Sequence, residues 1–197
     1  TKYYLKSRWT ERGYDAEFSH FIVGEEGNQW LTKPTFDYHN ITANIGFRKQ
    51  FYHEMEWLVN VSLASRNPNP SELFSDGLHH STGQIELGDL RLEKEQAYKF
   101  NTAFKKDWKS FQVQLNPFIN RISNFIYLQP TGFETTIRGA FPVWEFKQTE
   151  ALLTGFDVNT KWEISNHFSH ELGLAYVNGQ NLSTDEYLID MPPFVIN

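Results

Sequence analysis

The segment of residues 66–95, RNPNPSELFSDGLHHSTGQIELGDLRLEKE, decides the fold class of this chain. It is rich in Pro, Gly, Asn and Asp, residues that favour turns over continuous strands. On both sides of it, apolar and polar residues alternate with a period of two, which is typical of a β-strand with one apolar face. The segment is therefore predicted to be a long, turn-rich connection between two strands of one sheet.

Two features should order this connection. We expect Ser71 to cap a short helix that follows it, with Pro70 fixing the backbone at the start of that helix. Arg66 lies at the end of the preceding strand on its polar side and needs a carboxylate, for which Glu86 and Glu95 are the candidates. The guanidinium of Arg66 is thus expected to bond a carboxylate or backbone carbonyls within the connection.

The two-residue alternation extends over most of the remaining chain. Residues 40–48 and 56–66 both alternate, and the short linker between them predicts a hairpin. Four later segments repeat the pattern: 97–105, 111–116, 156–162 and 168–176. In total we expect about eight strands of about nine to eleven residues each, the length that crosses a bilayer at a tilt.

The period of two also assigns side chains to faces. The face expected to meet lipid carries Ile41, Ile45, Trp57, Val59, Val61, Phe100, Val113, Leu115, Val158, Leu172 and Leu174. The opposite face, expected to line an aqueous lumen, carries Asn44, Asn60, Asn101, Gln114, Asn159 and Glu171. The apolar face ends in aromatic residues, as an interfacial girdle would: Trp57, Phe104, Phe111, Trp162 and Tyr176.

The connections between strands alternate in length. Short ones are expected at residues 50–55, 106–109 and 165–167, and long ones at residues 67–94, 129–142 and 178–197. Short turns at one end and long loops at the other are the layout of an outer-membrane barrel. An antiparallel β-sandwich with one solvated face also alternates, so it stays open at this point.

Composition excludes several classes of protein. The chain has 197 residues, a net charge of -6 and no Lys/Arg-rich run, so binding to a phosphate backbone has no electrostatic basis. It lacks Cys, which removes disulfides, thiolate metal sites and Cys nucleophiles. No apolar stretch approaches the roughly 18 residues of a spanning helix, which leaves a strand-built membrane protein open.

The long connection resembles the barrel domain of TonB-dependent outer-membrane receptors. That family has an Arg-x-Pro at a strand end, then a Glu-Leu turn, a Gly-x-His, a Glu-x-Gly and a Leu-x-x-Glu that opens the next strand. The matching motif residues here are Arg66, Pro68, Glu72, Leu73, Gly77, His79, Gly83, Glu86, Gly88, Leu92 and Glu95. Further similar stretches extend the resemblance over about residues 38–197: 126–132, 146–151, 153–157 and 190–193. Residues 1–37 fit a preceding strand pair and loop but carry no family motif.

The resemblance implies an all-β fold, an antiparallel meander of long strands that forms a segment of a transmembrane outer-membrane β-barrel. Residues 1–197 are then expected to be a partial barrel from the later part of a receptor, without the family's plug domain. The implied function is import of a scarce nutrient, such as a ferric siderophore, across the outer membrane of a Gram-negative bacterium with energy from the TonB complex. The implied partners are outer-membrane lipid, the TonB complex acting through the plug, and the small-molecule nutrient. No cofactor, nucleic acid or enzymatic activity is implied.

Candidate site residues follow from the same stretch. The motif residues are expected to fold the connection rather than touch ligand, because Gly and Pro shape the backbone. Asp76, His79 and His80 are the candidate ligand-binding residues, as contacts to a metal or iron chelate at the outer surface. A dedicated metal site is not expected, because the adjacent His79 and His80 point in different directions and no HExxH is present. No catalytic residue is expected either, since the chain has no Gly-x-Ser-x-Gly elbow.

Two alternatives to the receptor remain. A complete small outer-membrane barrel of about eight strands would act as an adhesin or structural protein. A secreted carbohydrate-binding β-sandwich would place the same strands in water. For the receptor itself, ferric siderophore, cobalamin and oligosaccharide all stay open as ligands, because the loops show neither an Arg cluster nor an unusual aromatic patch.

Overall fold

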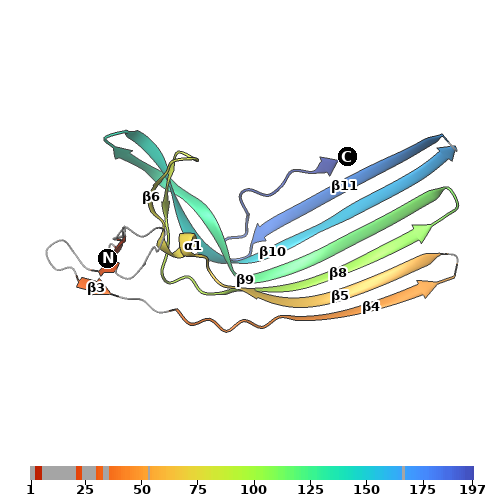
Figure 1. The fold of residues 1–197 in the computed structure, drawn as a ribbon, viewed down its shortest axis with the longest axis horizontal. Helices are drawn as coiled ribbons and strands as arrows, with labels where there is room; N and C mark the ends of the chain where they lie inside the picture. Colours follow the sequence, from red (N-terminus) through yellow and green to blue (C-terminus); the bar gives the residue numbers. More distant parts are fainter. Residues whose placement is uncertain (1–2, 6–20, 24–29, 33–35, 53, 166) are drawn as a thin grey trace, which may run out of the picture. The chain divides into compact units, whose positions relative to one another are not determined.

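A computed structural model describes residues 3–5, 21–23, 30–32, 36–52, 54–165 and 167–197 (Figure 1). The chain divides into two compact units. One consists of residues 1–39, 69–91 and 128–146, and the other of residues 40–68, 92–127 and 147–197. Among the described residues, the model contains no helix with the length and apolar character needed to cross a membrane.

The second unit is built on an antiparallel meander. Its strands follow in the order β4-β5-β8-β9-β10-β11, and Figure 1 shows them side by side with short turns at one end. Their bounds are β4 Ala43–Phe51, β5 Met55–Arg66, β8 Glu95–Asp107, β9 Phe111–Thr136, β10 Gly139–Ser165 and β11 Phe168–Asn181. Two short strands, β12 Glu186–Tyr187 and β13 Val195–Ile196, pair with β11. The predicted all-β meander and its first hairpin are thus confirmed.

In β4, β5, β8 and β9, the strand register confirms that the predicted apolar and polar residues lie on opposite faces. Ile45 pairs with Val61, which pairs with Phe100 on its other side. On the opposite face, Asn60 pairs with Asn101, and its Nδ2 donates to Asn44 Oδ1 at 2.7 Å. One member of the apolar set, Ile41, precedes β4 and lies in no strand.

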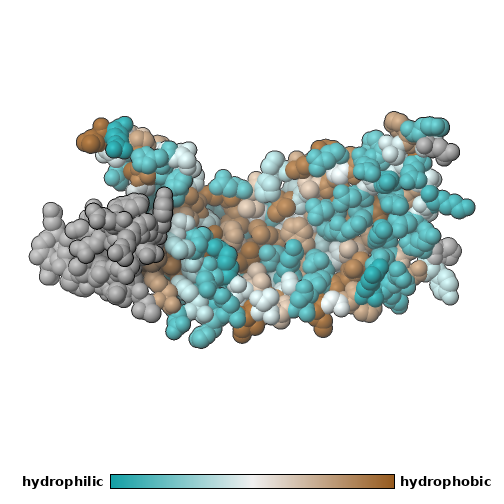
Figure 2. Space-filling model, viewed as in Figure 1, coloured by the Kyte–Doolittle hydropathy of each residue, from teal (hydrophilic) through white to brown (hydrophobic). Residues whose placement is uncertain are grey.

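The apolar face is uncovered in the described part of the chain. Ile45 is 73% exposed, Phe47 56% and Phe100 43%. Figure 2 shows apolar side chains at the surface between polar ones over these strands. In water such an expanse of exposed apolar surface would be an aggregation hazard, so this face requires a covering that the described residues do not supply.

The prediction that residues 129–142 form a long connection is wrong. β9 continues to Thr136 and β10 begins at Gly139, so only Ile137 and Arg138 form the turn. The segment is rich in Thr and Phe, which fit a pleated strand, and Gly139 takes the positive φ of 127° that follows the turn. These two strands have 26 and 27 residues, far more than the predicted nine to eleven.

One residue of β9 changes the alternation. The ladder between β8 and β9 ends at the pair Gln96 and Ser123, and Asn124 follows with a left-handed φ of 57°. Ile122 and Phe125 then join the same apolar cluster, although three positions separate them. Asn124 therefore interrupts the two-residue alternation of β9, in a left-handed conformation that Asn tolerates better than most residues.

The buried core of the second unit is small. The buried members of its apolar cluster are Ile122, Ala151 and Leu188, packed with Ala97, Phe125, Leu153 and Met191. Leu92 and Ile126 are also buried in this unit. Leu188 and Met191 come from the segment between β12 and β13, where they lie against Gly179 of β11. A Cβ at Gly179 would collide with the Met191 sulfur, so the missing side chain lets this segment pack on the sheet.

Residues 1–37 were expected to hold a strand pair and a loop. The described parts of this region form a three-stranded antiparallel sheet in the order β1-β2-β3. These strands are β1 Tyr3–Leu5, β2 Phe21–Val23 and β3 Trp30–Thr32. The expected loop lies outside the described residues.

Candidate functional site

The long connection begins with a capped helix. Helix α1 spans Pro70–Phe74, with Asn69 as the N-cap. Asn69 Oδ1 accepts from the Glu72 backbone N at 2.9 Å, and Glu72 Oε2 accepts from the Asn69 backbone N at 2.8 Å. This is a reciprocal capping box, and Pro70 occupies the first helical turn, where its missing N–H costs nothing.

The prediction that Ser71 caps this helix is therefore wrong. Ser71 lies inside the first turn, and its hydroxyl donates to Asn69 Oδ1 at 2.6 Å. Proline is most favourable as the first helical residue, so the cap must precede Pro70. Reading the capping residue one position before the proline would have identified Asn69.

Gly88 brings the far end of the connection against this helix. Gly88 N donates to Ser75 O at 2.7 Å, and Asp89 N donates to Glu72 O at 3.0 Å. A Cβ on Gly88 would lie 2.6 Å from the carbonyl carbon of Leu73, so only glycine permits this approach. Glu72 and Leu73 are buried there. The motif residues Glu72, Leu73 and Gly88 thus fold the connection.

A short hairpin fills the middle of the connection. Its strands are β6 Asp76–His79 and β7 Gln84–Leu87, and its turn includes Gly83 with φ of 66°. β7 also pairs in parallel with β10, where Ile85 lies opposite Val143. Ile85 is buried, so the hairpin is held to β10 by both a ladder and an apolar contact.

Arg66 and Glu95 close the two ends of the connection. They lie opposite each other in the β5–β8 register, and Arg66 Nε donates to Glu95 Oε2 at 2.6 Å. The other oxygen, Glu95 Oε1, accepts from the Ile126 backbone N at 2.7 Å. The predicted Arg66 contact is thus confirmed with Glu95. Glu86, the other candidate, accepts instead from Gln84 Nε2 at 2.9 Å.

Gln148 is a structural residue of this region that the sequence analysis did not identify. Its Nε2 donates to Glu93 O at 2.7 Å and to Asn124 O at 2.9 Å, and its Oε1 accepts from Glu93 N at 2.9 Å. The carboxamide therefore satisfies backbone groups just beyond the point where the ladder between β8 and β9 ends. The one sequence signal was Asn124 within an alternating run, because Asn is enriched at left-handed positions.

The hairpin does not gather the candidate ligand-binding residues. Asp76 and His79 are three positions apart on β6 and so point to opposite faces. His79 Nδ1 lies 3.1 Å from both Ser81 Oγ and Thr82 Oγ1, and His80 is exposed in the turn. Within the described ranges, no three His, Asp or Glu side chains are placed to hold a metal ion. A role in ligand contact stays a prediction for these residues.

Asp89, within the connection, and Tyr38, which precedes β4, have shifted pKa values. Arg91 donates from Nε to Asp89 Oδ1 at 2.9 Å and from Nη2 to Asp89 Oδ2 at 2.7 Å. These hydrogen bonds lower the pKa of Asp89 below its ordinary value, against the opposing effect of partial burial. Burial raises the pKa of Tyr38, whose ring stacks on Phe36.

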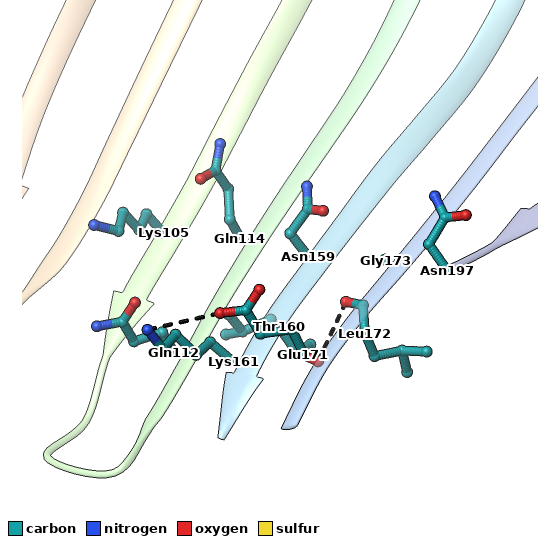
Figure 3. Close-up of a pocket in the computed structure, with 11 residues that line it drawn as sticks. Lys105, Gln112, Gln114, Asn159, Thr160, Lys161, Glu171, Leu172, Gly173 and Asn197 are labelled. Atoms are coloured by element: carbon teal, nitrogen blue, oxygen red, sulfur yellow. Dashed lines mark hydrogen bonds and ion pairs between the residues drawn. The ribbon is translucent and has the colours of Figure 1, made fainter. Parts of the chain in front are cut away.

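The polar face of the meander holds a hollow of about 540 Å³ (Figure 3). Its polar lining includes Lys105, Gln112, Gln114, Asn159, Lys161 and Glu171. Figure 3 shows Gln114 and Asn159 on neighbouring strands, with Lys161 and Glu171 joined as an ion pair at 3.6 Å. The lining offers hydrogen-bond donors and acceptors, so it is suited to contacting polar groups.

Comparisons with known proteins agree with this geometry. The family model described as "TonB dependent receptor-like, beta-barrel" matches residues 12–197. A solved structure described as "Copper transporter OprC" is similar over 78% of this chain and 22% of its own, with 16% identity and a TM-score of 0.65. The siderophore receptor PirA from Pseudomonas aeruginosa is similar over 71% of this chain and 28% of its own, with 14% identity and a TM-score of 0.58. The chain therefore spans less than a third of either structure, and by its family match it belongs to the TonB-dependent receptor-like β-barrel family.

Proposed function

We propose that residues 1–197 form part of the barrel wall and outer loops of an outer-membrane receptor that imports a scarce nutrient with energy supplied by TonB. The observation that carries this proposal is the continuous register from β4 to β8, which separates an exposed apolar face from a polar one. Such a sheet is stable where lipid covers one face and water or protein meets the other. The family match supports the receptor rather than another strand-built membrane protein.

The lengths of the connections support an orientation. The short turns after β4, β8 and β10 face the periplasm, and the long connection of residues 67–94 and the β9–β10 hairpin lie outside the cell. The bacterium is then Gram-negative, and the TonB complex acts through a plug domain of the whole receptor. This segment carries no chemical step.

Two observations support a class of ligand. The solved structures to which the chain is similar include a copper transporter and a siderophore receptor by their own descriptions. The outer hairpin of the long connection presents His80 at its exposed turn, with His79 and Asp76 on β6. We therefore propose an iron chelate of the ferric siderophore kind as the nutrient, contacted from this hairpin.

The alternatives have less support. In a β-sandwich a second sheet covers the apolar face, whereas Ile45, Phe47 and Phe100 are exposed in the part of the chain that the structure describes. A complete small barrel does not explain why the family model of a large receptor matches residues 12–197.

The experiment uses the intact receptor in cells. Ile137→Cys, in the turn of the β9–β10 hairpin, should react with a membrane-impermeant thiol reagent on whole cells. Ser110→Cys, in the turn after β8, should react only after the outer membrane is permeabilised. A deletion strain carrying the receptor should grow on at least one ferric siderophore of a panel under iron limitation, and a strain without it should not. Equal labelling of both positions on whole cells contradicts the orientation. If the two strains grow equally on every siderophore of the panel, the ligand class is contradicted.

A further inference from the structure

The apolar face has an unusual distribution of charge at its short-turn end. In the described strands, most charged side chains lie on the polar face and pair there, as Lys105 does with Asp107 at 3.2 Å and Lys161 does with Glu171 at 3.6 Å. Two lysines, Lys49 of β4 and Lys106 of β8, lie instead on the apolar face. Neither forms an ion pair with any described residue.

The register places these lysines in one patch. In the strand register, Lys49 of β4 is opposite Trp57 of β5, which is opposite Phe104 of β8. Two residues along, Lys106 of β8 is opposite Met55 of β5, which is opposite Phe51 of β4. Strand β5 therefore lies between the two lysines. We call these six residues the turn-end patch: Lys49, Phe51, Met55, Trp57, Phe104 and Lys106. From strand spacing and rise, the two lysine Cα atoms are about 12 Å apart, within the combined reach of two flexible side chains.

Aromatic rings form the floor of the turn-end patch. Trp57 stacks on Phe104 with ring centroids 6.0 Å apart, and its Nε1 donates to Thr102 Oγ1 at 2.7 Å, which fixes the indole. Lys49 Nζ lies 5.0 Å from the centroid of the Phe51 ring, and Lys106 Nζ lies 5.4 Å from that of Trp108. Each ammonium thus rests on a ring while its outer side remains open to a negatively charged group.

We propose that the turn-end patch binds the headgroup of an anionic phospholipid of the periplasmic leaflet, with Lys49 and Lys106 on the phosphodiester and the aromatic rings against the glycerol and upper acyl chains. The inference rests on the proposed membrane orientation. The net charge of the chain is -6, so the chain as a whole repels anions. In the proposed orientation, the two ammonium groups that form no ion pair with described residues make the lipid-facing side locally positive. A lysine at the edge of the hydrocarbon extends to the interface, where lipid phosphate is the available counter-ion.

The test uses the full-length receptor, purified in detergent and given an equimolar mixture of phosphatidylglycerol and phosphatidylcholine. Native mass spectrometry then counts the lipids that remain bound. We expect the receptor to retain phosphatidylglycerol preferentially. In the double variant Lys49→Gln/Lys106→Gln, the ratio of bound phosphatidylglycerol to bound phosphatidylcholine should fall about fivefold for each lysine removed. Lys49→Arg/Lys106→Arg should keep it.

Lys99→Gln is the matched control, because Lys99 Nζ also rests over a ring, that of Phe118 at 5.3 Å, but on the polar face. An unchanged preference in the double glutamine variant, or an equal loss in Lys99→Gln, overturns the inference. If excess inorganic phosphate releases the lipid, the turn-end patch is a site for a free anion, and the inference of a lipid site is also overturned. If the double variant does not assemble, the two single variants supply the same comparison.

Heat-modifiable migration separates this inference from the proposed function. A receptor that shifts on heating but shows no preference for phosphatidylglycerol refutes the lipid site and leaves the barrel standing. A receptor that neither shifts on heating nor retains any lipid refutes the membrane function itself.

Discussion

Replacing Glu95 with alanine should open the junction between the long connection and the sheet. The carboxylate is buried and holds two groups, the Arg66 guanidinium at 2.6 Å and the Ile126 backbone N–H at 2.7 Å. A hydrogen bond to a charged group contributes about 1.5–3 kcal/mol. The Arg66 side chain is 45% exposed, so solvent screening reduces its share to about 1 kcal/mol or less.

Most of the free energy lost in Glu95→Ala should therefore come from the hydrogen bond to the Ile126 backbone N–H. Loss of about 2 kcal/mol there raises the amide exchange rate of Ile126 about thirtyfold, because the amide exchanges through local opening. Glu95→Gln, which keeps an acceptor oxygen, should raise the rate by about tenfold or less. Hydrogen exchange of the intact receptor, followed by mass spectrometry of the peptide that contains Ile126, measures both.

Glu134→Gln supplies the control, because Glu134 is an exposed carboxylate on the same strand. It should leave the exchange of Ile126 unchanged. The reasoning is refuted if Glu95→Ala also leaves that exchange unchanged, or if Arg66→Ala accelerates it more than Glu95→Ala does.

Three further changes test other parts of the molecule. Gly88→Ala should loosen the long connection by about 1–3 kcal/mol, because the new Cβ meets the backbone of Leu73; protease sensitivity of the connection measures this. Asp89 has a lowered pKa, so its bonds to Arg91 stabilise the connection above the ordinary Asp value of 3.8 and are lost as pH falls through the lowered value. Asp89→Asn should remove that acid-side step, seen as pepsin cleavage against pH. Val59→Arg, at a strand midpoint of the apolar face, should cost about 2–4 kcal/mol in urea unfolding from vesicles.

Each change has a matched control. Gly46→Ala should be tolerated, because the nearest atom to its Cβ would be 3.4 Å away on a flexible side chain. Glu93→Gln should leave the pH step intact. Asn60→Arg, on the polar face, should cost far less than the arginine on the apolar face. Equal costs for the two arginine substitutions would show that both faces meet water.

The two-residue period was sufficient to predict the first hairpin and the separation of its faces. A period of two fixes which side chains share a face, so the sequence could assign Asn60 and Asn101 to one face, although not to neighbouring positions on it. For Arg66 the sequence predicted a carboxylate partner but left Glu86 and Glu95 as alternatives, and the structure shows Glu95 as the partner.

What the sequence did not predict depends on contacts across strands rather than on local patterns. Gln148 bonds the backbone of Glu93 and Asn124, which are distant in the chain, and a single Gln carries no sign of such partners. The residues between Gln129 and Pro142 were mistaken for a loop because Pro and Gly punctuate them. In the structure they lie in one hairpin whose strands satisfy each other's backbone groups.

Asn124, with its left-handed backbone, divides β9 into two frames of alternation. Before it, even-numbered residues such as Ile122 face the small core, and after it odd-numbered ones such as Phe125 do. Deleting Asn124 would move every later side chain of β9 to the opposite face of the sheet, although the sequence of those residues would be unchanged.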